Sequence, residues 1–256
     1  MHTASLLPTP LSCKRAASPL MPRLVLLSDT HGQHGSVSVP DGDVLVFAGD
    51  ACGAGTPTEW KGFCAWLGTQ PHAHKVVIAG NHDWPLQPSI PEWNVRPRYG
   101  PTERGQALRR VEDAGAVLLQ DSGATVAGLR FWGSPWVPFF YDWAFNLPRG
   151  GERLAELRGR IPAGLDVLVT HGPPHGVLDL AASGVHAGCE PLADRLAVLD
   201  AEGGAPRLHV FGDIHEAAGV LPPAGVEGRI SVNAAVLDLQ YRLVRGPVVL
   251  DLEAGA

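Results

Sequence analysis

The chain has 256 residues, of which 45% are hydrophobic and 18% charged, and its formal net charge at pH 7 is −6. These values are typical of a globular protein with one large domain or two small ones. The acidic balance and the lack of a basic block argue against a long nucleic acid as partner. No apolar run reaches the ~18 to 20 residues that a membrane-spanning helix needs, so no membrane partner is expected.

Residues 1–21 are expected to be a disordered leader. Lys14 and Arg15 come late in this segment and three prolines interrupt its apolar stretches. A secretory signal begins with its positive charge and continues with an unbroken apolar core, so the segment fits that role poorly. The four cysteines show no CxxC spacing (Cys13, Cys52, Cys64 and Cys189). Reduced, mostly buried thiols are therefore expected, which favours a cytoplasmic location.

Short runs rich in Val, Leu and Ile predict strands at 24–27, 44–48, 75–79, 116–119, 129–132, 167–170, 208–211, 230–232 and 248–252. Many of these runs show little alternation, which indicates strands that are covered on both faces. Helices are predicted between them at 58–67, 104–114, 151–160 and 190–202. This alternation predicts an α/β (α+β) fold, with one domain over residues 22–254.

Five short motifs come directly after predicted strands, and each supplies an Asp, Asn or His. They are Asp29-Thr30-His31, Gly49-Asp50, Gly80-Asn81-His82-Asp83, Thr170-His171-Gly172 and Gly212-Asp213-Ile214-His215. Each motif alone also fits an ordinary turn or helix cap. Their succession in this order favours a set of metal ligands that is gathered from the ends of several strands.

Together the motifs supply nitrogen and oxygen ligands without a thiolate: Asp29, His31, Asp50, Asn81, His171, Asp213 and His215. This set suits Mn, Fe, Zn or Co. A carboxylate at Asp50, after a glycine turn, is placed to bridge two ions ~3.5–4 Å apart. Such a pair would generate hydroxide near neutral pH and hold a phosphoryl group for in-line attack. His82 could then point toward the phosphate as a proton donor or charge stabiliser.

The ordered motifs resemble those of the calcineurin-like metallophosphoesterase superfamily over roughly residues 22–253. The segments 132–136, 145–150, 170–174 and 208–216 resemble more closely the metallophosphodiesterase branch that includes the MPPED proteins. This resemblance implies a two-sheet sandwich flanked by helices (four layers, αββα), cyclic-nucleotide phosphodiesterase activity and Mn as the usual metal. It also places Asp29, His31 and His215 on the first metal, Asp50 between the metals, Asn81 and His171 on the second, and His82 at the phosphate.

Two positions depart from patterns of the superfamily. Its last motif is normally Gly-His-x-His, whereas this chain has Gly212-Asp213-Ile214-His215. Asp213 either ligates through oxygen, which gives a harder site suited to Mn or Mg, or leaves the second metal weakly held. Protein Ser/Thr phosphatases of the superfamily carry Asp-Arg-Gly shortly after Gly-Asp, but Asp50 is followed by Ala51-Cys52-Gly53. The protein-phosphatase interpretation is therefore disfavoured.

Candidates for substrate contact are Asn81, His82, Asn146 and Arg149, although the last two fit a loop-ordering role equally well. Six aromatic residues crowd between 131 and 145 (Trp132, Trp136, Phe139, Phe140, Tyr141 and Trp143). Core packing is favoured for them over a wall that stacks on a nucleobase. Near the motifs, His175 is expected to be a solvated loop residue, and Glu216 to orient a ligand or cap a turn.

The predicted function is hydrolysis of small phosphodiesters, such as cyclic nucleotides, by a hydroxide bound to two metals. One alternative is a regulatory protein of low activity that binds metal or nucleotide through a weakened second metal site. Another is a phosphomonoesterase or nuclease on the same scaffold, because these motifs build the phosphoryl site and not the pocket that reads the leaving group.

Overall fold

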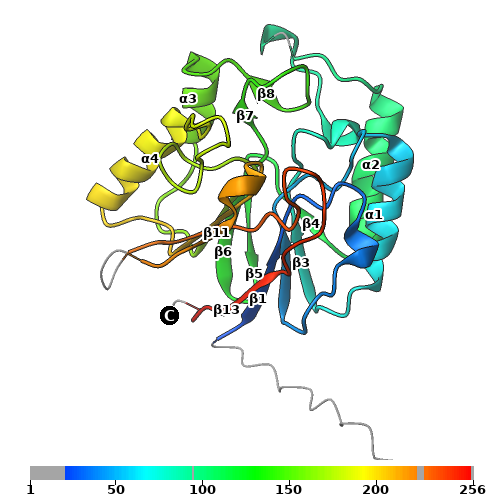
Figure 1. Cartoon of the computed structure of the whole chain (residues 1–256), viewed down its shortest axis with the longest axis horizontal. Helices are drawn as coiled ribbons and strands as arrows, with labels where there is room; N and C mark the ends of the chain where they lie inside the picture. Colours follow the sequence, from blue (N-terminus) through cyan, green and yellow to red (C-terminus); the bar gives the residue numbers. More distant parts are fainter. Residues whose placement is uncertain (1–20, 94, 224–227, 255–256) are drawn as a thin grey trace, which may run out of the picture.

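The computed structural model describes residues 21–93, 95–223 and 228–254. The predicted leader, apart from Met21, lies outside the described residues. Two main sheets pack face to face, and a pair of helices covers the outer face of each one (Figure 1). This is the predicted four-layer arrangement of α/β (α+β) type, which is confirmed. The predicted extent of the domain, 22–254, stays a prediction.

The first sheet has the strand order β13-β1-β2-β3-β4. Its strands are β1 (Arg23–Leu27), β2 (Val44–Phe47), β3 (His74–Val77), β4 (Val117–Leu118) and β13 (Val248–Asp251). The first four pair in parallel, and β13 runs antiparallel to β1 at the edge. The carboxyl ends of β1, β2 and β3 therefore lie at one edge of the sheet, and the first three motifs follow these ends.

The second sheet has the order β11-β12-β10-β9-β6-β5. Its strands are β5 (Ser122–Val126), β6 (Leu129–Ser134), β9 (Val167–Thr170), β10 (Leu208–Phe211), β11 (Gly219–Leu221) and β12 (Ile230–Asn233). The four central strands are parallel, and β5 and β11 are antiparallel edges. A small third sheet pairs β7 (Val137–Pro138) with β8 (Asn146–Leu147).

Helices α1 (Pro57–Thr69) and α2 (Pro101–Asp113) cover the first sheet, and α3 (Glu152–Gly159) and α4 (Glu190–Ala201) cover the second (Figure 1). Helix α1 begins at a capping box between Thr56 and Glu59, with Pro57 in the first turn. Short 3-10 turns lie at η1 (His34–Ser36), η2 (Trp84–Leu86), η3 (Pro91–Trp93) and η4 (His215–Ala217). No helix among the described residues is long and apolar enough to span a bilayer.

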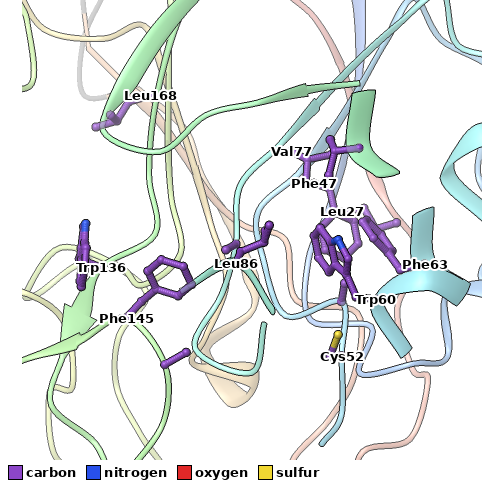
Figure 2. Packing of buried hydrophobic residues seen from close by; sticks show 14 of the residues in the cluster. Leu27, Phe47, Cys52, Trp60, Phe63, Val77, Leu86, Trp136, Phe145 and Leu168 are labelled. Carbon is purple, nitrogen blue, oxygen red and sulfur yellow. The ribbon is translucent and has the colours of Figure 1, made fainter. Parts of the chain in front are cut away.

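The buried strands have a core on both faces, which explains their unbroken apolar runs. In β1, Leu24 and Leu26 belong to the cluster between the two sheets, whereas Val25 and Leu27 belong to the cluster beneath the helices. Figure 2 shows Leu27 beside Trp60 and Phe63 of α1. Because the sheet cannot slip by one residue without exchanging these two faces, the register that places the motifs is strongly fixed.

The two sheets meet at the edge where the motifs lie. The backbone N–H of Ser28, at the end of β1, donates to Ala234 O at 3.1 Å, and that of Gly212, at the end of β10, donates to His171 O at 2.8 Å. His171 Nδ1 in turn lies 2.9 Å from Ala48 O of the first sheet. These bonds hold the motif loops of both sheets against one another.

Candidate metal centre

All seven predicted ligands lie at this shared edge. Three groups each offer ligand atoms within 4.8 Å of one another: Asp29 with His31 and His215, Asp29 with Asp50 and His171, and His31 with Asp50 and His82. Because Asp29, His31 and Asp50 each occur twice, the groups form one continuous cluster. It is almost fully buried, with Asp29 and His171 at 0% exposure.

The loops that carry the ligands are sharply bent. The backbone φ is 56° at Asp29, 42° at His31, 59° at Asp50 and 68° at Asp213. This left-handed conformation costs a residue other than glycine on the order of 1–3 kcal/mol and concentrates at functional sites. Gly212 makes the close approach possible, since a Cβ there would clash with Asp29 Oδ2 and Ser28 Oγ. The chain therefore holds four of its seven predicted ligands in an unfavourable conformation.

Backbone carbonyls orient the histidines. The Nδ1 atom of His31 lies 3.1 Å from Cys52 O, that of His171 lies 2.9 Å from Ala48 O, and that of His215 lies 3.2 Å from Asp238 O. Since a carbonyl only accepts, each Nδ1 carries the hydrogen of its bond. The opposite atom, Nε2, then points into the cluster, and this arrangement is typical of histidines that bind metals.

Asp50 lies between the two halves of the cluster. Its Oδ2 is 3.5 Å from His31 Nε2, and its Oδ1 is 3.4 Å from His171 Nε2. Burial raises the pKa of this carboxyl, but His171, His82 and His31 outweigh burial and hold the pKa well below its usual range. The group is therefore an anion with one oxygen toward each side, which is the geometry that a bridging ligand needs.

On the side of the second sheet, Asn81 Oδ1 lies 2.8 Å from His171 Nε2. Asp213 Oδ1 lies farther away, 3.7 Å from the same nitrogen. The backbone N–H of Asp213 donates to both oxygens of Asp29 at 3.1 Å, so this residue positions Asp29 as well. Asp213 belongs to none of the three groups formed by the described residues.

The cluster carries an excess of negative charge. Burial raises the pKa of Asp213 to about 6, and the charges of Asp50 and Asp29 add to this effect. Burial would lower the pKa of His215, but its hydrogen bond and attraction to Asp29 raise it to about 9. In contrast, burial dominates at His31 and lowers its pKa to about 4. Carboxylates that draw protons in this way also attract cations, and the nitrogen and oxygen donors fit borderline or hard divalent ions.

Comparison with known proteins agrees with the metal-binding character of this cluster. The family model described as calcineurin-like phosphoesterase matches residues 22–217. The chain belongs to this family. It is 41% identical over 239 residues to the metallophosphoesterase domain-containing protein 1 of Homo sapiens and of Mus musculus, covering 90% of this chain and 71% of each relative. A crystal structure with 15% identity superposes with a TM-score of 0.61 over 92% of this chain and 100% of that one, which bears on the fold alone.

Membership of the calcineurin-like phosphoesterase family indicates a hydrolase that acts on phosphoesters with divalent metal ions. The donor set of the cluster fits such ions, because it offers four imidazole nitrogens, an amide oxygen and carboxylates in one buried space. The specific ligand roles of these residues stay predictions.

Asp83 supports the loops of the centre, a role that the sequence did not predict. Its fully buried carboxylate accepts hydrogen bonds from the backbone N–H groups of Gly80, Asp50 and Cys52 at 2.8, 3.0 and 3.0 Å, and from Ala51 at 3.3 Å. It thus ties together the second and third motif loops of the family. Its place in the Gly80–Asp83 motif was the only signal in the sequence.

His82 lies at the border of the cluster. Its backbone N–H donates to Asp50 Oδ1 at 2.8 Å, and its Nδ1 lies 2.5 Å from Gly53 O. The ring of Trp143 stacks on the imidazole at a centroid distance of 3.8 Å. The ring is therefore fixed from both sides, and Nε2 is the nitrogen left for a ligand or a proton.

The aromatic residues of 131–145 divide between the two interpretations. Trp136 is fully buried in the core, as Figure 2 shows beside Phe145, and this supports core packing. Phe139, Phe140 and Tyr141 are mostly exposed on the loop between β7 and β8. Of the six, only Trp143 makes a ring contact with a predicted site residue, His82.

Asn146 and Arg149 use their side chains within the protein. Asn146 Nδ2 donates to the carbonyls of Phe140 and Tyr141 at 3.0 and 2.9 Å. Arg149 donates to Gly188 O at 2.8 Å, to Ala187 O at 2.6 Å and to Glu190 at 2.7 Å. These bonds support the loop-ordering alternative over substrate contact. Likewise, Glu216 Oε1 accepts from Ala182 N at 2.6 Å, and His175 is exposed.

Tyr241 also lies at the centre, although it comes after the last motif and beyond the matched residues of the family model. Its ring contacts His31 edge-on at a centroid distance of 4.8 Å and His215 at 5.5 Å. Burial raises the pKa of its hydroxyl, and Asp50, Asp29 and Asp213 raise it further, so the hydroxyl is a proton donor at neutral pH. No motif in the sequence signals this residue.

Proposed function

We propose that this protein is a phosphodiesterase that hydrolyses small phosphodiesters, such as cyclic nucleotides, with two divalent ions, of which Mn is the first choice. The observation that carries the proposal is the placement of one buried carboxylate, Asp50, between two carbonyl-oriented imidazoles, with one oxygen toward His31 and the other toward His171. A third such imidazole, His215, lies 3.4 Å from Asp29 in the same cluster. Membership of the phosphoesterase family and the resemblance to the MPPED branch support it.

Each half of the cluster would hold one ion. Asp29, His31 and His215 would hold the first, Asn81 and His171 the second, and Asp50 would bridge them. Bound divalent ions would lower the pKa of a water from about 16 toward 7 and neutralise charge on the phosphoryl group. Burial of the cluster excludes bulk water and strengthens the attraction between these ligands and cations.

His82 would act on the leaving group. The Gly53 carbonyl fixes its Nδ1, and Trp143 fixes the plane of its ring, so Nε2 is held where it could give a proton to the leaving ester oxygen. General acid catalysis of this kind contributes about 10²- to 10⁴-fold. The expected loss of kcat in His82→Ala lies in that range.

A small substrate in the cytoplasm is the best match to the chemistry of the chain. The net charge of −6 disfavours a long nucleic acid or an anionic membrane as partner. The described cysteines, Cys52, Cys64 and Cys189, are free and buried, which supports a reducing compartment.

The test is hydrolysis of bis-p-nitrophenyl phosphate against p-nitrophenyl phosphate by metal-stripped protein after addition of Mn, Fe, Zn, Co or Mg. The proposal expects metal-dependent turnover with a preference for the diester, lost in Asn81→Ala and His82→Ala. His74→Ala is a matched control, because this exposed histidine begins β3, at the opposite end from the motif. A preference for the monoester would favour the phosphomonoesterase alternative, and wild-type turnover in His82→Ala would contradict its role.

Asp213 favours one second candidate, a metal- or nucleotide-binding regulatory protein of low activity. The carboxylate stands in the place of a histidine and lies 3.7 Å from His171 Nε2, whereas Asn81 lies at 2.8 Å. The second ion would be weakly held if Asp213 did not ligate it. A large gain of turnover in Asp213→His would support this candidate, and a loss would show that Asp213 works as a ligand.

A further inference from the structure

Tyr241 has an unusual backbone for its residue type. Its φ is 56°, in the left-handed region that glycine and asparagine adopt readily and that bulky side chains avoid. The residue is also 49% exposed, so burial does not explain the choice of tyrosine here. A strained residue that persists at the border of a candidate active site indicates a functional constraint.

The turn that carries Tyr241 also positions a predicted metal ligand. The Asp238 carbonyl accepts from Tyr241 N at 2.9 Å and lies 3.2 Å from His215 Nδ1. The Asp238 carboxylate accepts from Gln240 N and Arg242 N, both at 2.9 Å, which closes the turn around Tyr241. From the other side, Gln33 Nε2 donates to the Tyr241 carbonyl at 2.8 Å. The protein thus fixes the backbone of Tyr241 relative to His215 by several independent bonds.

Tyr241 is half exposed, whereas His215, one of the imidazoles that its ring contacts, is buried. Its ring contacts the edges of His31 and His215, and His31 in turn contacts His82 at a centroid distance of 4.6 Å. Trp143 follows in this row of ring contacts, stacked on His82. Tyr241 and Trp143 are therefore the two ends of an aromatic row that passes along the imidazoles of the centre. Tyr241 is thus the exposed end of this row, next to His31 and His215.

We propose that Tyr241 is a substrate-binding residue of this centre, and that its hydroxyl donates a hydrogen bond to a phosphoryl oxygen of the ester. This inference rests on the proposed phosphoesterase function and adds a residue to it. The hydroxyl suits the task because it is a neutral donor at pH 7 and adds no charge to a cluster that already holds several carboxylates. The ring at the same time contacts His31 and His215, two of the predicted ligands of the first metal.

Two substitutions separate the hydroxyl from the ring. Tyr241→Phe removes only the hydroxyl, and Tyr241→Asn removes the ring while keeping a residue type that tolerates a positive φ. Tyr99→Phe is the matched control, since it removes a hydroxyl from a tyrosine that packs against the core instead of the centre. For each full-length protein, the measurements are the Kd for Mn, the Kd for inorganic phosphate in the presence of Mn, and kcat and KM with bis-p-nitrophenyl phosphate.

Tyr241→Phe should weaken phosphate binding and raise KM about tenfold, as expected for one hydrogen bond to a charged group, with the Kd for Mn unchanged. Tyr241→Asn should weaken phosphate binding at least as much, and Tyr99→Phe should match wild type. Unchanged phosphate binding and KM in both Tyr241 variants would overturn the proposal. If Tyr241→Phe lost as much affinity for Mn as for phosphate, this would also overturn the proposal, because the residue would then only shield the histidines.

The phosphate arm keeps this test independent of turnover. If the wild type hydrolyses neither bis-p-nitrophenyl phosphate nor p-nitrophenyl phosphate, the proposed activity fails. If Tyr241→Phe nevertheless binds phosphate more weakly than the wild type does, the role of Tyr241 stands. If hydrolysis is normal and Tyr241→Phe behaves as wild type, the activity stands and the role of Tyr241 fails. A Mn-loaded wild type that binds no phosphate would overturn both.

Discussion

Asp83→Ala is the perturbation that most sharply separates the support of the metal centre from its ligands. The Asp83 carboxylate is fully buried and accepts four backbone N–H groups, of which three donors, on Gly80, Asp50 and Cys52, lie at 3.0 Å or less. A buried donor left without an acceptor costs about 1–3 kcal/mol. If water satisfies one of these three donors, two remain unsatisfied at about 2 kcal/mol each, and the free energy of unfolding of the variant should fall by about 4 kcal/mol. That is a large part of the roughly 5–15 kcal/mol that stabilises a typical domain.

The assay is urea unfolding followed by tryptophan fluorescence, together with a Mn titration of the protein that remains folded. The Kd for Mn should rise about 10- to 100-fold, as for other residues that support metal ligands, because the loops of Asp50 and Asn81 lose their common anchor. Asp41→Ala, an exposed aspartate before β2, should change stability by less than about 0.5 kcal/mol. A loss below about 1 kcal/mol in Asp83→Ala, with unchanged Mn affinity, would refute the view that this carboxylate builds the centre.

Two further outcomes follow from the same structure. Gly212→Ala should weaken Mn binding roughly tenfold or more, since its Cβ would displace Asp29. Gly35→Ala is the control, because the space around this glycine is open, and it should bind Mn as the wild type does. Equal Mn affinities of the two variants in a titration would contradict this reasoning. Burial lowers the pKa of His209 well below its usual 6.5, so unfolding takes up a proton there as the pH falls below about 6.5. Between pH 6.5 and 5.5, the free energy of unfolding of the wild type should therefore fall by up to about 1.4 kcal/mol per pH unit more than that of His209→Asn. If urea unfolding gives the same pH dependence of stability for both proteins, this reasoning is wrong.

The sequence predicts the sheets well because their strands are buried on both faces. Runs such as 24–27 and 208–211 can hardly be anything but central strands, and each lies in β1 or β10. Parallel strands end at the same edge, so polar motifs that follow them can be expected to meet. The strands β5, β7, β8 and β11 were not predicted, because two of them have two residues and the other two are edge strands with glycine or polar residues.

The missed residues of the centre depend on contacts that no local pattern records. Asp83 is one letter of a motif, but its role comes from four N–H groups on two separate loops. Tyr241 reaches His31 from a turn about 200 residues later in the chain, and nothing in Leu239-Gln240-Tyr241-Arg242 marks a positive φ. Asn146 and Arg149 look like substrate contacts by residue type, yet their hydrogen bonds are used within the protein.

The presence of a two-metal centre is tested by the number of Mn ions that the metal-stripped protein binds, measured by isothermal titration calorimetry near neutral pH. We expect two ions per wild-type chain and one in His171→Ala, because Asp29, His31, His215 and Asp50 remain to hold the first. His74→Ala should still bind two. A wild type that binds no Mn, or a His171→Ala variant that binds as many ions as the wild type with equal affinity, would contradict it.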